Sequence, residues 1–286
     1  LSPPTSLLSP NGSHPHRFSS NFAFVAARAA RSMARPRQPP QERRPVLAMS
    51  VRLIRPAFDL RMLRKTKRKE ITMPVSELPF ADCILHGDCI EALKTVPDET
   101  VDLVVTDPPY LVNYKDRSGR SILGDDNGDW LKPAFAQIHR VLKNHAFCIS
   151  FYGWGEVDKF MTAWKDVGFR PVGHLVWHKR YASNSKYLNY RHEQAFLLAK
   201  GRPPIPHKVL DDIHPWKYSG NGLHPNQKSV EIIKPLIMAF SKKGDLVLDP
   251  FAGSGTTALS AKLTERRYLA IEKDPAYYEA ARQRLI

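Results

Sequence analysis

The sequence has little cysteine and no long hydrophobic run. Its 286 residues include three cysteines, Cys83, Cys89 and Cys148, which form neither a paired metal-binding spacing nor an even set of disulfide partners. We therefore expect no metal site and a reducing compartment, so the predicted location is cytoplasmic. No apolar run approaches the roughly 18 residues that a membrane-spanning helix needs, and no membrane association is expected.

Acidic residues are scarce in the first quarter of the chain. Residues 1–72 carry 15 Lys and Arg against 3 Asp and Glu, whereas residues 73–286 carry 28 against 25. Most of the net charge of +15 therefore lies in a segment rich in Pro, Ser and Arg. This composition predicts that 1–72 is a disordered or non-native basic leader. An organelle transit peptide is the alternative.

From about residue 80, short apolar runs alternate with helix-like segments. The expected strands are 83–86, 101–106, 146–151, 173–177, 195–198, 245–248 and 268–271. The expected helices are 89–95, 131–143, 156–167, 229–241, 256–264 and 275–285. This alternation predicts an α/β fold with a seven-stranded, mostly parallel sheet and helices on both faces. Ligands bind such sheets at the carboxyl ends of the strands.

The stretch VVTDPPY runs an apolar strand into Asp107, two prolines and Tyr110. Each proline lacks a backbone N–H and fixes φ, so two in succession end the strand. They also hold the neighbouring carbonyl groups in one direction. The stretch therefore predicts that a carboxylate, rigid carbonyl groups and an aromatic ring are presented together at a strand end, where they can bind a ligand.

The stretch LVLDPFAGSGTT leads an apolar strand through Gly253 and Gly255 into a helix. Two glycines let the backbone approach a ligand closely. A P-loop is excluded because no Gly-Lys-Ser/Thr is present, and the third glycine of a dinucleotide fingerprint is missing, since Thr256 and Thr257 follow. Glu272 ends the next strand and is suited to hold ribose hydroxyls. Together these features predict a pocket for an adenosine-bearing cofactor.

The two stretches resemble the hallmarks of the S-adenosylmethionine-dependent DNA amino-methyltransferases, the adenine-N6/cytosine-N4 family. The family's acid-Pro-Pro-aromatic tetrapeptide and Phe-x-Gly-x-Gly turn correspond to residues 107–110 and 251–255. The catalytic motif precedes the cofactor motif, which is the order of the beta class. The resemblance spans about 80–286 and implies a methyltransferase domain with a permuted, Rossmann-like class I methyltransferase fold.

The resemblance implies a role for each matching residue. The catalytic residues would be Asp107, Pro108, Pro109 and Tyr110. The cofactor, S-adenosylmethionine, would be bound by Asp88, Asp249, Phe251, Gly253, Gly255, Thr256, Thr257 and Glu272. The HPNQK stretch is similar to the family's HPTQKP and would bind the methionine end of the cofactor through His224, Asn226, Gln227 and Lys228. Leu111 and Ser229 depart from the family's usual Asn and Pro, which leaves the loop geometry beside the site open.

The tetrapeptide suits methyl transfer to an amino group. Such a group on a base is a poor nucleophile because its lone pair is delocalised into the ring. Asp107 and the Pro108 carbonyl would accept its two N–H groups and favour a pyramidal nitrogen, and Tyr110 would stack on the base. The target base must leave the duplex to reach them. Asp at the first position usually accompanies adenine-N6 enzymes in this family, so adenine is favoured and cytosine-N4 is the alternative.

A basic segment lies between the two motifs. Residues 178–243 carry 12 Lys and Arg against 4 Asp and Glu, with aromatic residues interleaved. We expect a target-recognition insertion at 178–228, in which Arg180, Lys186 and Arg191 contact double-stranded DNA. A homodimer and a cognate restriction endonuclease are further partners that the resemblance allows.

Two other function classes stay open at this point. One is a methyltransferase of glutamine side chains or of RNA, in which Asn usually stands in place of Asp107 and the cofactor turn comes first. The other is a non-catalytic DNA-binding relative, in which loss of Asp107, Tyr110 or the glycines is expected. The chain retains all of these residues.

Overall fold

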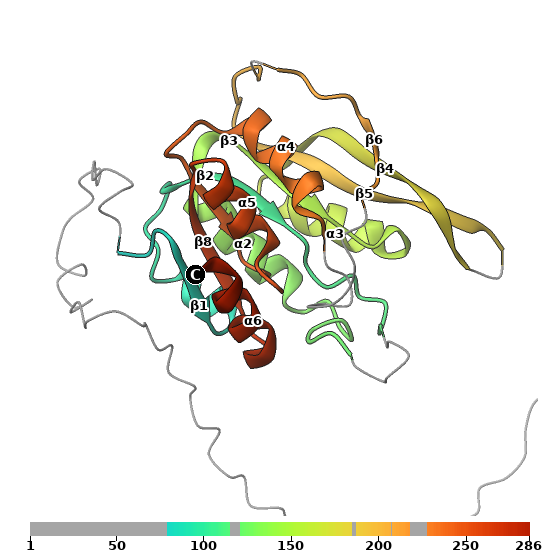
Figure 1. Ribbon diagram of the computed structural model, residues 1–286, viewed down its shortest axis with the longest axis horizontal. Coiled ribbons are helices and arrows are strands. Elements are labelled where there is room, and N and C mark those ends of the chain that lie inside the picture. The colour runs from blue at the N-terminus through green and yellow to red at the C-terminus, as the bar shows by residue number, and fades with distance from the viewer. Residues whose placement is uncertain (1–78, 115–120, 185–186, 207, 218–227) are drawn as a thin grey trace, which may run out of the picture. The chain divides into compact units, whose positions relative to one another are not determined.

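The computed structural model describes residues 79–114, 121–184, 187–206, 208–217 and 228–286 (Figure 1). The predicted leader, 1–72, lies outside these residues. The helices are α1 (Cys89–Leu93), α2 (Leu131–Val141), the 3₁₀ helix η3 (Trp154–Glu156), α3 (Val157–Asp166), α4 (Val230–Phe240), α5 (Thr256–Leu263) and α6 (Pro275–Leu285). The strands are β1 (Cys83–His86), β2 (Val101–Thr106), β3 (Leu142–Phe151), β4 (Arg170–Asn184), β5 (Asn189–Lys200), β6 (Ile213–Pro215), β7 (Leu246–Asp249) and β8 (Arg267–Glu272).

In the described part of the chain, the strands form one eight-stranded sheet with the order β1-β8-β7-β2-β3-β5-β4-β6. Strands β1, β8, β7, β2 and β3 run parallel to one another, and β6 is parallel to β4. Only β5 runs against its neighbours, β3 and β4. The predicted α/β fold with a mostly parallel sheet is confirmed. The structure adds β6, a three-residue edge strand that is too short to show a periodic pattern.

Buried side chains alternate along the central strands because helices cover both faces of the sheet. Val104 in β2 packs in the layer formed with α1, α2 and α3, which also buries Phe135 and Trp164 completely. Leu103 packs in the opposite layer, which includes Ile233 and other side chains of α4, α5 and α6. Figure 1 shows α5 and α6 on one side of the sheet and α2 on the other.

The parallel register brings several strand ends to one edge of the sheet. His86, the last residue of β1, pairs with Glu272, the last residue of β8. Asp249 ends β7 and pairs with the neighbouring strand β8, while Thr106 ends β2. Because parallel strands finish on the same side, Asp107 and Glu272 lie at the same edge although they are far apart in the sequence.

Strands β4 and β5 extend well beyond their expected bounds of 173–177 and 195–198. They pair with each other from Arg170–Ala199 to Asn184–Asn189, and their far ends project from the sheet as a two-stranded ribbon (Figure 1). His178 and His192 pair with each other at the base of this ribbon and are both exposed. The sequence under-predicts these strands because a ribbon with little core to cover needs no long run of apolar side chains.

Gly255 is required where α5 begins. Its φ is +76°, in the left-handed region that favours glycine. A Cβ at this position would lie 3.0 Å from the Cβ of Ala281, a fully buried residue of α6. The glycine therefore permits both the turn into α5 and the close packing of α5 against α6.

We predict that Gly255→Ala lowers the free energy of unfolding by about 2 kcal/mol, because the methyl group adds left-handed strain and a tight contact. The measurement is the thermal melting temperature. Gly155→Ala is the matched control, since a Cβ at 155 has no neighbour within 4 Å. Equal melting temperatures for the two variants would contradict this account of Gly255.

Candidate active site

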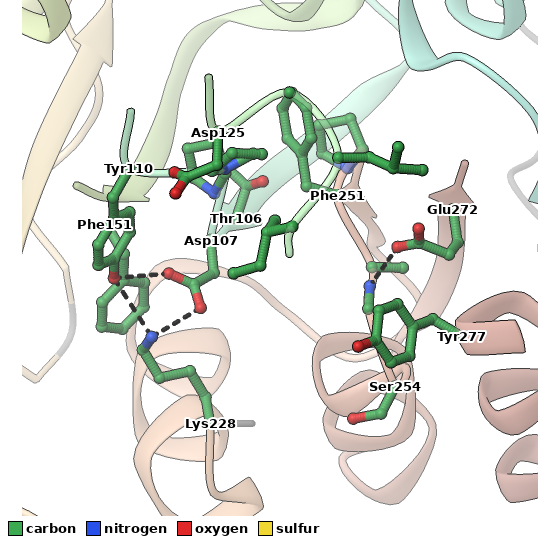
Figure 2. A pocket seen from close by; sticks show the side chains of 18 of the residues that line it. Thr106, Asp107, Tyr110, Asp125, Phe151, Lys228, Phe251, Ser254, Glu272 and Tyr277 are labelled. Carbon is green, nitrogen blue, oxygen red and sulfur yellow. Dashed lines mark hydrogen bonds and ion pairs between the residues drawn. The ribbon is translucent and has the colours of Figure 1, made fainter. Parts of the chain in front are cut away.

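A cavity of about 560 Å³ lies at the edge where the parallel strands end. The residues that follow the strands line it: Gly87 after β1, Asp107 after β2, Pro250 after β7 and Lys273 after β8. Figure 2 shows two groups of polar side chains in this cavity. We call the side around Asp107 the acid end and the side around Gly253 the glycine end.

Hydrogen bonds fix the Asp107 carboxylate at the acid end (Figure 2). The Tyr110 hydroxyl donates to Asp107 Oδ1 at 2.7 Å, and the Lys228 ammonium donates to Asp107 Oδ2 at 2.6 Å. Lys228 Nζ also lies 3.3 Å from the Tyr110 hydroxyl oxygen and 4.8 Å from the centre of the Phe151 ring. An acid, a hydroxyl and an ammonium therefore form one connected group.

The Tyr110 side chain is held in place by its surroundings. Burial first, and then the negative charge of Asp107, raises the pKa of its phenol well above the ordinary value, so the hydroxyl stays protonated and can donate. Gly153, just after β3, packs against it. A Cβ at 153 would lie 2.8 Å from the Tyr110 carbonyl oxygen and 2.9 Å from its Cβ. Only glycine at this position permits so close an approach.

The loop after the tetrapeptide is fixed by a buried acid. Leu111 and Asn113 have φ values of +63° and +52°, which are unfavourable for side-chain-bearing residues. Asp125 is buried and accepts the backbone N–H groups of Val112 and Tyr114 at 3.3 and 2.6 Å. These bonds offset the backbone strain. Residues 111–114 are thus held by Asp125 although Leu111 replaces the family's usual Asn.

The glycine end joins the turn before α5 to the tip of β8. The Gly253 N–H donates to Glu272 Oε2 at 2.7 Å, and the Asp274 N–H donates to Glu272 Oε1 at 2.7 Å. Burial raises the pKa of Glu272 from 4.5 to about 7, although these two N–H groups act in the opposite direction. Each carboxylate oxygen retains a lone pair that can accept a hydroxyl group of a ligand.

Asp88 completes the glycine end after β1. Its Oδ1 accepts the Ile90 N–H at 2.9 Å and so caps α1, while its Oδ2 lies 3.1 Å from Lys273 Nζ. The aromatic rings of Phe251 and Tyr277 line the same cavity. This end therefore offers carboxylates and flat apolar surfaces, which suit the sugar and base of an adenosine group.

Most of the predicted site residues line the cavity, and some do not. The residues that line it are Asp88, Asp107, Pro108, Pro109, Tyr110, Lys228, Phe251, Gly253, Thr256, Thr257 and Glu272. Asp249 and Gly255 lie behind the wall: Asp249 accepts the Phe251 N–H at 3.2 Å, and burial raises its pKa to about 6. Arg180 and Arg191 are exposed on the ribbon. The predicted site residues Lys186, His224, Asn226 and Gln227 lie outside the described residues.

The sequence did not identify several residues that line the cavity from β3, β4, β5 and the segment after β6. Lys179 is buried and forms an ion pair with Glu193 at 2.9 Å, and both line the cavity. The Trp216 indole N–H is buried and has no hydrogen-bond partner among the described residues, and this side chain lines the cavity as well. One signal was present: Lys179 follows the apolar residues Leu175 and Trp177 at alternate positions, so period-two alternation could have placed it on the same inner face.

The described residues hold no group of three or more His, Cys, Asp or Glu side chains arranged to bind a metal ion. In the same part of the chain, no helix is long and apolar enough to cross a membrane. The cavity does fit S-adenosylmethionine, because the features of the glycine end that suit an adenosine group lie in one space with the acid end.

Three comparisons with known proteins agree with this geometry. The DNA methylase family of N6 and N4 enzymes matches residues 101–283. YubD of Escherichia coli (strain K12), a predicted methylase, is 51% identical over 201 residues, which cover 70% of this chain and 88% of YubD.

Two solved structures share the fold. A predicted DNA modification methylase of Thermus thermophilus, TTHA0409, complexed with S-adenosyl-L-methionine, matches with a TM-score of 0.56 and 25% identity, over 70% of this chain and 91% of that one. The cytosine-N4-specific PvuII DNA methyltransferase matches with a TM-score of 0.59 and 19% identity, over 71% and 86%. The motifs, the cavity and the family match lead to one conclusion: the chain belongs to the S-adenosylmethionine-dependent N6/N4 DNA amino-methyltransferases.

Proposed function

We propose that the protein methylates the exocyclic N6 amino group of adenine within a short sequence of double-stranded DNA. The observation that carries the proposal is the Asp107 carboxylate, which lines the cavity at the end of β2 and is fixed by two hydrogen bonds. A carboxylate at this position is typical of the family's adenine enzymes. The cytosine-N4 alternative keeps the same mechanism and changes only the base.

Asp107 and Pro108 would activate the target amino group. The carboxylate and the Pro108 carbonyl each accept one N–H, which aims the nitrogen lone pair into the cavity. S-adenosylmethionine supplies an electrophilic methyl group, whose bond to sulfur breaks with the electron pair left on sulfur. The nitrogen gains the methyl group and loses one proton, which Asp107 or water accepts. Catalysis by this chain is therefore mainly orientation and electrostatics.

The two ends of the cavity would hold the two substrates. At the glycine end, Glu272 would accept the ribose hydroxyls and Asp88 would contact the adenine of the cofactor. At the acid end, the extruded base would lie beside Tyr110 and Phe151, since a base in the duplex cannot reach a recessed group. Lys179 and Glu193, in the wall formed by the ribbon, would border the same base.

The ribbon is the part of the described chain best placed to contact DNA outside the cavity. Arg180 and Arg191 are exposed on it and would contact phosphates. Trp154, which is 56% exposed, packs against Tyr190 of β5 with ring centres 5.1 Å apart. We propose that the exposed residues of the ribbon belong to the predicted target-recognition insertion, 178–228, and that Trp154 packs beside them. A homodimer, a partner endonuclease and a cytoplasmic location stay predictions.

The reaction product tests the proposal. Residues 73–286 would be incubated with labelled S-adenosylmethionine and unmethylated duplex DNA, and the nucleosides separated by mass spectrometry. The expected product is N6-methyladenine, and sequencing of the modified bases would then give the recognition sequence. N4-methylcytosine would overturn the choice of base, and a product in RNA or protein alone would overturn the choice of substrate.

We predict that Asp107→Ala lowers the single-turnover rate by at least about 100-fold, because one preorganised group at the reacting nitrogen is lost. Cofactor affinity should change little, since Asp107 lies at the opposite end from Glu272 (Figure 2). Rapid-quench methyl transfer and calorimetric cofactor binding measure the two effects. Asp126→Ala, at an exposed acid, is the control. Undiminished turnover in Asp107→Ala would rule out the assigned mechanism.

We predict that affinity for S-adenosylhomocysteine rises up to about tenfold between pH 6 and pH 8. The pKa of Glu272 is raised to about 7, so its carboxyl group is mostly protonated at pH 6 and ionised at pH 8, when it is the better acceptor for ribose hydroxyls. Isothermal titration calorimetry measures the dependence. Glu272→Gln should bind more weakly at pH 8 and lose this slope. An unchanged slope in that variant would assign the pH dependence to another group.

A further inference from the structure

We infer that Lys228 is a positioning residue of the methyl-transfer centre, which holds the Asp107 carboxylate in its reactive orientation. This inference rests on the proposed function. It differs from the role implied by the HPNQK stretch, in which Lys228 binds the methionine end of the cofactor. A positioning residue must contact Asp107, whereas a cofactor-binding residue must contact the methionine end of S-adenosylmethionine. Experiments can therefore separate the two roles.

The contacts of Lys228 favour the acid over the cofactor. The side chain is 7% exposed, and among the described residues its polar partners are Asp107 Oδ2 at 2.6 Å and the Tyr110 hydroxyl at 3.3 Å. Its ammonium also lies over the Phe151 ring, 4.8 Å from the centre, and 5.5 Å from the centre of the Tyr110 ring. All of these groups belong to the acid end.

The Lys228 ammonium and the Tyr110 phenol bond to different oxygens of the Asp107 carboxylate. Lys228 donates to Oδ2 and Tyr110 donates to Oδ1, so the plane of the Asp107 carboxylate is fixed at both oxygens. Each oxygen has a second lone pair, which can accept an N–H of the target amino group. Removal of Lys228 would free the carboxylate to rotate and would leave its charge half-buried without a cation.

Lys228 orients the acid and does not take part in proton transfer. As an ammonium, it has no lone pair and cannot accept the proton that the amino nitrogen loses. A second positive charge close to the nitrogen would also oppose the charge that develops there during transfer. The Asp107 carboxylate, which accepts a hydrogen bond from Lys228 at 2.6 Å, offsets this positive charge.

The backbone beside Lys228 is itself anchored. Ser229 caps α4 and accepts the Glu231 N–H at 3.2 Å, and the first turn of the helix buries Ile232 and Ile233 against the sheet. The lysine therefore projects from a fixed point at the start of a packed helix. A side chain supported in this way loses little additional entropy when it holds a partner.

Kinetics separate the two roles. Lys228→Met should lower the single-turnover rate at saturating cofactor by at least about 100-fold, because the acid loses the group that orients it. The Kd for S-adenosylhomocysteine should change little. Lys228→Arg, which keeps the charge, should recover a large part of the lost rate. Lys243→Met removes an exposed lysine paired with Glu265 and should match the wild type. A strongly weakened Kd with a normal saturated rate would overturn the inference.

A double-mutant cycle of melting temperatures tests the contact between Lys228 and Asp107. Because it needs no methyl-transfer assay, its result does not depend on the proposed DNA substrate. Asp107→Asn and Lys228→Met each leave one charge without its partner, and each should lower the melting temperature. The double variant carries neither charge, so its melting temperature should fall by less than the sum of the falls in the two single variants. Additive falls would show that the two side chains do not interact, and would overturn the inference.

Discussion

The structure depends on one constraint: parallel strands finish on the same side of a sheet. The order β1-β8-β7-β2 places the ends of four strands side by side, and the chain uses those ends for its polar groups. Asp107 and Glu272 therefore share one cavity although the chain between them forms most of the fold. Helices on each face exclude water from the strands and leave the edge as the place where polar groups can meet a ligand.

Burial of a charged group at this edge is energetically unfavourable, and different partners offset this cost at the two ends of the cavity. Glu272 is held by two backbone N–H groups, and burial raises its pKa to about 7. Asp107 is instead held by an ammonium and a phenol. The two amides leave lone pairs on Glu272 for the hydroxyl groups of a ligand, whereas Lys228 and Tyr110 fix the orientation of the Asp107 carboxylate toward an amino group.

The sequence predicted what is encoded locally. The tetrapeptide, the glycine turn and the acid after the next strand are each short patterns with a direct backbone consequence, and the cavity contains all three. What depended on tertiary contact was harder to predict. The partner of Lys228 comes from a distant strand end, and Gly255 serves helix packing as well as the turn. The ribbon was under-predicted because its exposed pairs, such as His178 with His192, lack an apolar pattern.

The most direct test of the central claim is a crystal structure of the protein with S-adenosylhomocysteine and a duplex that contains the methylated sequence. The account predicts an extruded base at the acid end, with its amino nitrogen within hydrogen-bond distance of the Asp107 carboxylate and the Pro108 carbonyl, and the cofactor ribose at Glu272. A base bound outside the cavity, or a cofactor whose ribose lies at Asp107, would contradict the account.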